Sequence, residues 1–179
     1  MGWTSYIATH YKNGKVDCKA EMDSRLTQYE HDGYPELNVL KSAIKGGTYY
    51  AAVQIKHNGV QEKVLGVVAL ISTKWHDGMN FGYKDMDETM GPGYYDCPKT
   101  ILDLLTPTDS EWANEWRQKC REQLNRPKLG QLPIGTKIKW NDKELEKCAP
   151  SYQFKTPWWC IVGESKYVPK TRIKEFEVL

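Results

Sequence analysis

Three β-type runs in the first half of the chain are separated only by turn residues. The runs cover residues 37–44, 48–56 and 62–72. Gly46-Gly47 separates the first two runs, and His57-Asn58-Gly59 separates the last two. Short glycine-containing connections of this kind join antiparallel strands in hairpins. The chain is therefore predicted to contain an antiparallel sheet, with a further short strand near residues 79–83.

Helices are predicted before and after these runs. Asp17 can cap a helix over about residues 17–29, whose apolar face is formed by Cys18, Met22, Leu26 and Tyr29. Pro98 starts a second, short apolar helix. Thr108-Asp109-Ser110-Glu111 has the form of a capping box and opens a third helix, to about residue 124. Its apolar stripe repeats every four residues, at Trp112, Trp116, Cys120 and Leu124.

The sequence changes character after residue 125. Short β-type runs alternate there with Gly, Pro and an Asn-Asp pair, which is typical of a small, strongly bent β-sheet or β-barrel. The predicted fold class is α+β. An antiparallel sheet with two or three packed helices and an acidic loop occupies residues 1–125, and a small basic β module occupies residues 126–179.

Charge is divided unevenly along the chain. Residues 1–111 carry 11 Lys/Arg and 15 Asp/Glu, whereas residues 112–179 carry 14 and 8, and the whole chain has a net charge of +2. The basic C-terminal part is therefore where an anionic partner is expected.

No segment indicates a membrane span, a secretion signal or a cofactor. The longest apolar run, residues 64–71, is too short to cross a bilayer, and the N-terminus lacks the basic and apolar parts of a signal peptide. The five cysteines are irregularly spaced and form no Cys-x-x-Cys pair, so neither a structural zinc site nor a disulfide framework is expected. We predict a cytoplasmic protein with reduced thiols.

Residues 82–100, GYKDMDETMGPGYYDCPKT, combine carboxylates, tyrosines and a cysteine. The carboxylates can hold Mg²⁺ or Mn²⁺, or they can cap turns and the helix that follows. We favour the second interpretation because Asp and Gly are common in turns for local reasons. Cys97 has no histidine in a recognised arrangement with it, so no catalytic residue is predicted. The stretch is interpreted as a partner-binding edge formed by Asp85, Asp87, Glu88, Tyr94, Tyr95 and Asp96.

Two adjacent tryptophans, Trp158 and Trp159, lie in the basic module. Neighbouring residues on a strand point to opposite faces, so one ring is expected in the core and the other outside. An outward Trp among lysines suits base stacking with phosphate neutralisation. Alternatively, both rings pack against the other domain and the lysines form an ordinary solvated face. Under the first alternative the nucleic-acid-binding residues are Lys137, Lys139, Lys155, Trp158, Trp159, Lys166, Lys170 and Arg172.

Three segments resemble a family of uncharacterised proteins carried by phages, plasmids and conjugative elements of Gram-positive bacteria. They are MGWTSYIATHYKNGKVDCKAEMD at the N-terminus, FGYKDMDETMGPGYYDCPKTILDLLTPTD in the centre and PWW near the C-terminus. The resemblance implies an accessory role on a mobile element. No reaction is established for the family, so it assigns no catalytic residue.

These observations predict one of three functions. The first, which we prefer, is a non-enzymatic inhibitor that binds a host defence nuclease in the manner of an anti-CRISPR protein, with the acidic edge imitating phosphates. The second is a nucleic-acid-binding accessory protein that acts through the basic module. The third is a metal-dependent nuclease that uses the same carboxylates.

Overall fold

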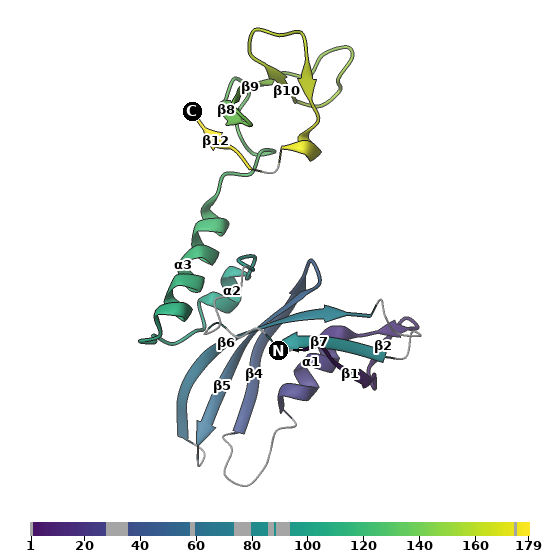
Figure 1. Cartoon of the computed structure of the whole chain (residues 1–179), viewed down its shortest axis with the longest axis vertical. Coiled ribbons are helices and arrows are strands. Elements are labelled where there is room, and N and C mark those ends of the chain that lie inside the picture. The colour runs from purple at the N-terminus through teal and green to yellow at the C-terminus, as the bar shows by residue number, and fades with distance from the viewer. Residues whose placement is uncertain are drawn as a thin grey trace. The chain divides into compact units, whose positions relative to one another are not determined.

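The computed structural model describes residues 2–27, 36–57, 60–73, 80–85, 88, 94–173 and 175–179 (Figure 1). The chain forms two compact units, Met1–Asn125 and Arg126–Leu179. Among the described residues, no helix is long and apolar enough to cross a membrane. The predicted α+β class is confirmed, because antiparallel sheets and helices occur in separate stretches of the sequence.

The N-terminal unit is built on a five-stranded antiparallel sheet. Its strand order is β1-β7-β6-β5-β4, with bounds β1 Thr4–Ile7, β4 Glu36–Lys45, β5 Thr48–His57, β6 Val60–Ser72 and β7 Asn80–Asp85. The predicted pairings of β4 with β5 and of β5 with β6 are confirmed. Gly46 and Gly47 both adopt positive φ, 59° and 82°. That is the backbone of the two-residue turns that match the twist of antiparallel strands.

Residues 3–11, WTSYIATHY, have the β-branched and aromatic composition of a strand but do not form a single strand. β1 ends at Ile7, and a separate small hairpin joins β2 (Tyr11–Lys12) to β3 (Lys15–Val16). Between them, the backbone N–H groups of Thr9 and His10 donate to the carboxylate of Glu21 in α1 (Cys18–Thr27). Because these donors bind a helix side chain, they cannot continue a strand ladder.

Both faces of the sheet are buried at β5. Tyr50 and Ala52 of β5 pack with α2 (Lys99–Leu102) and α3 (Glu111–Asn125). Tyr49, Ala51 and Val53 of β5 face the other way and pack with Met22 of α1. This alternation explains why β5 reads as an almost continuous apolar run.

The predicted starts of α1 and α2 are confirmed, whereas α3 begins later than predicted. Asp17 caps α1, since its Oδ1 accepts from the Ala20 N–H at 3.1 Å, and Pro98 directly precedes α2. The capping-box prediction for α3 is wrong. The helix begins at Glu111, and the Ser110 hydroxyl is the cap, accepting from the Ala113 N–H at 3.3 Å.

The buried stripe of α3 also differs from the predicted one. Four residues advance a helix by more than one full turn, so a stripe repeating every four residues drifts around the axis. Trp112 at one end is 61% exposed and Leu124 at the other is 37% exposed. The buried residues are Ala113, Trp116, Arg117 and Cys120. Tyr29, predicted on the face of the first helix, lies outside the described residues.

The C-terminal unit is a second five-stranded antiparallel sheet. Its order is β11-β10-β9-β8-β12, with bounds β8 Lys137–Trp140, β9 Lys143–Cys148, β10 Trp158–Ile161, β11 Tyr167–Val168 and β12 Glu177–Val178. A single 3-10 turn, η2 (Lys170–Arg172), follows β11. The sheet is open, so the predicted β-sheet is confirmed in preference to the predicted closed barrel. Its core is formed by Ile138, Leu145, Trp159, Val168 and Ile173.

Candidate nucleic-acid interface

The two adjacent tryptophans point to opposite faces of β10. Trp159 is 2% exposed and lies in the core of the C-terminal unit. Trp158 is half-buried on the opposite face, where its indole Nε1 donates to the carbonyl of Ala149 at 3.0 Å. The prediction of one inward and one outward ring is therefore confirmed.

Trp158 belongs to a group of three rings that we call the outer aromatic cluster: Phe154, Trp158 and Tyr167. The ring centroid of Phe154 is 4.9 Å from that of Trp158 and 4.9 Å from that of Tyr167. Tyr167, on β11, is 55% exposed. Phe154 is held by a tight turn in which Ser151 N–H donates to its carbonyl at 2.7 Å. Aromatic rings with exposed faces are platforms on which nucleobases stack.

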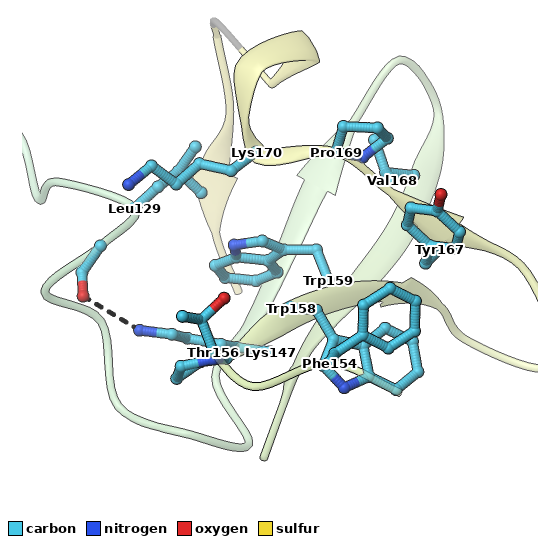
Figure 2. A pocket seen from close by; sticks show the side chains of 12 residues that line it. Leu129, Lys147, Phe154, Thr156, Trp158, Trp159, Tyr167, Val168, Pro169 and Lys170 are labelled. Atoms are coloured by element: carbon cyan, nitrogen blue, oxygen red, sulfur yellow. Dashed lines mark hydrogen bonds between the residues drawn. The ribbon is translucent and has the colours of Figure 1, made fainter. Parts of the chain in front are cut away.

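A half-open pocket of about 370 Å³ lies beside this cluster (Figure 2). Its walls include all three rings of the outer aromatic cluster, the inward Trp159, and two lysines, Lys147 and Lys170. The Lys170 Nζ lies near Gly130, which also lines the pocket. An apolar and aromatic lining with a small number of polar or charged groups is the usual make-up of a ligand-binding pocket.

Lys147 is an unexpected member of this site. It is 6% exposed, and its Nζ donates to the backbone carbonyls of Gly130, at 3.1 Å, and of Leu132. An ammonium has three donors, so two carbonyls leave one donor for a further acceptor. Side chains alternate between the two faces along Glu144-Leu145-Glu146-Lys147, so Lys147 points to the core side together with Leu145. This alternation is the sequence signal from which an inward-pointing lysine could have been predicted.

The predicted basic residues divide into two groups. Lys137 pairs with Glu144 at 2.7 Å, which raises the pKa of that lysine, and Lys166 pairs with Glu164 at 3.3 Å. The others are exposed, and no carboxylate within the described residues forms an ion pair with them: Lys139, Lys155, Lys170 and Arg172. These four are the predicted cations that remain available to a phosphate backbone. Lys170 lines the pocket, and Lys155 lies between two of its lining residues, Phe154 and Thr156.

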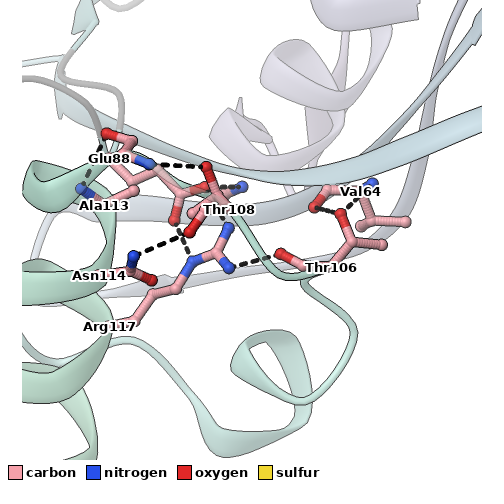
Figure 3. Close-up of polar contacts among 9 residues, drawn as sticks. Val64, Glu88, Thr106, Thr108, Ala113, Asn114 and Arg117 are labelled. Carbon is pink, nitrogen blue, oxygen red and sulfur yellow. Dashed lines mark hydrogen bonds and ion pairs between the residues drawn. The ribbon is translucent and has the colours of Figure 1, made fainter.

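The acidic stretch is placed differently from what its composition suggests. Glu88 has a side chain only 3% exposed and forms a bidentate ion pair with Arg117, Nη2–Oε1 2.7 Å and Nε–Oε2 2.8 Å (Figure 3). The Gly66 N–H donates to Oε1 at 3.0 Å, and Arg117 Nη1 donates to the Thr106 carbonyl at 2.6 Å. Glu88 is therefore inside the N-terminal unit and does not belong to an exposed edge.

This ion pair also covers an edge of the sheet. β7 pairs with β6 only at Ala69–Ser72, and no described strand continues along that side of β6. There, Val64 N–H donates to the Thr106 hydroxyl at 3.1 Å, and Thr106 N–H donates to the Val64 carbonyl at 3.0 Å. Together with the Gly66–Glu88 bond, these contacts occupy backbone groups that would otherwise pair with another chain.

The remaining residues of the predicted acidic edge are partly engaged. Asp96 pairs with Lys45 at 3.1 Å, and both side chains are about half exposed. Tyr94 is 39% exposed, whereas Tyr95 packs against the α2–α3 core. Asp87 and the side chain of Asp85 lie outside the described residues.

In the part of this stretch that the structure describes, the cysteine is not a reactive thiol and no metal centre is formed. Cys97 is fully buried, and burial raises the pKa of its thiol well above the usual range, so it is protonated at neutral pH. Among the residues that the structure describes, no three His, Cys, Asp or Glu side chains are grouped to hold a metal ion.

A family model for a domain of unknown function, DUF6927, matches residues 107–143. The match runs from the residues before α3 to the start of β9, and it covers a minor part of the chain. No curated protein and no solved structure matches the chain. The description of DUF6927 states no activity and no host, so the predicted mobile-element setting stays a prediction.

Proposed function

We propose that this protein binds single-stranded nucleic acid through the outer aromatic cluster and the adjoining pocket of its C-terminal unit. The observation that carries the proposal is the combination of three contacting rings on the outer face with Lys147 and Lys170 in one pocket. Stacking on rings and neutralisation of phosphates are the two interactions that sequence-tolerant single-strand binders combine.

A single strand fits this arrangement better than a duplex does. Bases within a duplex are stacked on each other and present only their edges in the grooves, whereas an unpaired base offers a face to an aromatic ring. The cluster lies beside a pocket, and Tyr167 is its most exposed member. Lys139, Lys155, Lys170 and Arg172 then supply charge for the backbone.

The test is binding of a fluorescently labelled single-stranded oligonucleotide of about 12 nucleotides, measured by fluorescence anisotropy. Replacement of Trp158 or Tyr167 by Ala is expected to weaken binding by about 5-fold to 150-fold, the equivalent of about 1–3 kcal/mol for one lost stack. Trp112→Ala is the matched control, because Trp112 is an exposed ring in the other unit. Circular dichroism checks that each variant is folded.

Equal affinity of the wild-type chain, Trp158→Ala and Tyr167→Ala would contradict the proposal. A loss of the same size in Trp112→Ala would also contradict it, because binding would then not depend on this cluster.

The defence-inhibitor hypothesis remains a separate prediction. Within the described part of the predicted acidic edge, Asp96 is the exposed carboxylate, and it forms an ion pair with Lys45. The hypothesis is tested by replacing Asp85 and Asp87 with Lys, which is expected to abolish inhibition of a host nuclease and to leave oligonucleotide binding intact. The metal-dependent nuclease hypothesis predicts nicking of plasmid DNA in the presence of manganese, and intact plasmid at micromolar protein would contradict it.

A further inference from the structure

The sulfur atoms of Cys148 and Cys160 lie next to each other on the outer face of the C-terminal sheet. The two Sγ atoms are 2.6 Å apart, and both residues are half-buried free thiols. Eleven residues separate them in the sequence, so their spacing matches no motif.

The strand register explains how they meet. Cys148 is directly opposite Trp158, and Cys160 is directly opposite Glu146, so the two cysteines are diagonal neighbours on adjacent strands. Both thiols also contact the carbonyl of Glu146, at 3.5 and 3.6 Å. Diagonal neighbours share one face of a sheet, and both sulfurs therefore point the same way.

The other three cysteines have different surroundings. Cys97 and Cys120 are fully buried in the N-terminal unit, and Cys18 begins α1. The pair in the C-terminal unit thus combines close approach with partial exposure, which a reagent from solution requires.

We infer that Cys148 and Cys160 are a modification site at which a small disulfide compound, such as oxidised glutathione, introduces an intrachain disulfide. The thiolate of one cysteine attacks the glutathione disulfide, forms a mixed disulfide and releases one glutathione thiolate. The second cysteine then loses its proton and attacks the protein sulfur of the mixed disulfide, releasing the second glutathione. The protein loses two electrons and two protons, and one glutathione disulfide becomes two glutathione thiols.

The bond closes the loop that carries the pocket wall. Residues 149–159 lie between the two cysteines and include Phe154, Lys155 and Trp158. A cross-link at the base of this loop restricts the conformations open to it. The inference stands whether or not the protein binds nucleic acid, because it concerns only the two sulfurs.

Burial and the neighbouring Cys160 thiol raise the pKa of Cys148 to about 11. Little of this sulfur is thiolate at neutral pH, so the reaction is expected to accelerate as the pH rises.

The experiment incubates the folded full-length chain with oxidised glutathione at pH 8 and measures intact mass. The expected product has lost two hydrogens, and peptide mapping links Cys148 to Cys160. Cys148→Ser and Cys160→Ser are expected to keep one glutathione on the remaining cysteine, because no partner displaces it. Cys18→Ser is the control and is expected to form the linked product normally.

Three results would overturn the inference: a chain that stays reduced, a native chain that accumulates glutathione without the link, or a link between other cysteines. The same incubation in urea tests whether the fold brings the sulfurs together. The Cys148–Cys160 product is expected to lose its dominance there, and an equal yield in urea would overturn the assignment to the folded sheet.

Discussion

Arg117→Met is expected to destabilise the N-terminal unit strongly. The change removes three hydrogen bonds, two to Glu88 and one to the Thr106 carbonyl. Glu88 remains as a buried carboxylate with the Gly66 N–H as its one remaining donor among the described contacts. Removal of one partner from a buried ion pair costs about 3–5 kcal/mol, because the other charge is left uncompensated.

Urea unfolding measures this loss. With a slope of about 2 kcal/mol per molar urea, the midpoint falls by roughly 1.5–2.5 M. Hydrogen exchange followed by mass spectrometry assigns the loss to a unit. Exchange is expected to accelerate in α3 and β6 and to stay unchanged in β8–β11, which serves as an internal reference.

Arg121→Met is the matched control, since Arg121 is an exposed arginine on the same helix. Its cost is expected to stay within about 0.5 kcal/mol. Glu88→Gln combined with Arg117→Met is expected to cost less than the sum of the two single changes, because neither variant residue leaves a buried charge. A cost below about 1 kcal/mol for Arg117→Met would refute the reasoning.

Three further predictions concern the stability of the N-terminal unit, each read from urea midpoints. Gly66→Ala is expected to cost about 1–3 kcal/mol, because a Cβ there lies 3.0 Å from an oxygen of the buried carboxylate. Ser110→Ala is expected to lower the free energy of unfolding by about 1 kcal/mol, because the α3 cap is lost. Glu111→Ala is expected to change it little. A larger loss for Glu111→Ala than for Ser110→Ala would instead support the predicted capping box. Burial raises the pKa of Tyr50 and that of Cys120 to about 12 each. The unfolded chain releases both protons at lower pH, so stability is expected to fall as the pH rises from about 9 towards 12, and Tyr50→Phe should flatten the upper part of this decline.

The sheet of the N-terminal unit was predictable because its signals are local. Gly46-Gly47 adopts the positive φ values that only a few residues tolerate, and the flanking runs have strand composition. Turn and strand preferences act within a few residues, so sequence alone reveals them.

The role of Glu88 was not predictable in this way. Its partner Arg117 is 29 residues away, and the pairing depends on how α3 packs against the sheet. Arg117 does follow Ala113 and Trp116 at helical spacing, so a charged residue on a buried stripe was a signal that a partner is needed. The composition of the acidic stretch suggested a binding or metal-holding role for Glu88, whereas its carboxylate forms a buried structural ion pair.

In the candidate site, alternation predicted one inward tryptophan but not which one. The choice depends on register, since Trp159 is opposite Lys147 and next to Val168 on the core face. Phe154 joins the cluster through the loop between β9 and β10, whose path is set by tertiary contacts. The sequence therefore predicted a basic module rich in aromatic residues, but not the pocket within it.

The salt dependence of single-strand binding tests the central claim most directly. If Lys139, Lys155, Lys170 and Arg172 each meet a phosphate, a plot of log affinity against log salt concentration is expected to have a slope of roughly −3, and Lys155→Ala with Lys170→Ala is expected to reduce it by about 1.4. Lys99→Ala, an exposed lysine of the other unit, serves as the control. No binding at about 50 mM salt, or an affinity that does not change with salt, would contradict the proposed nucleic-acid interface.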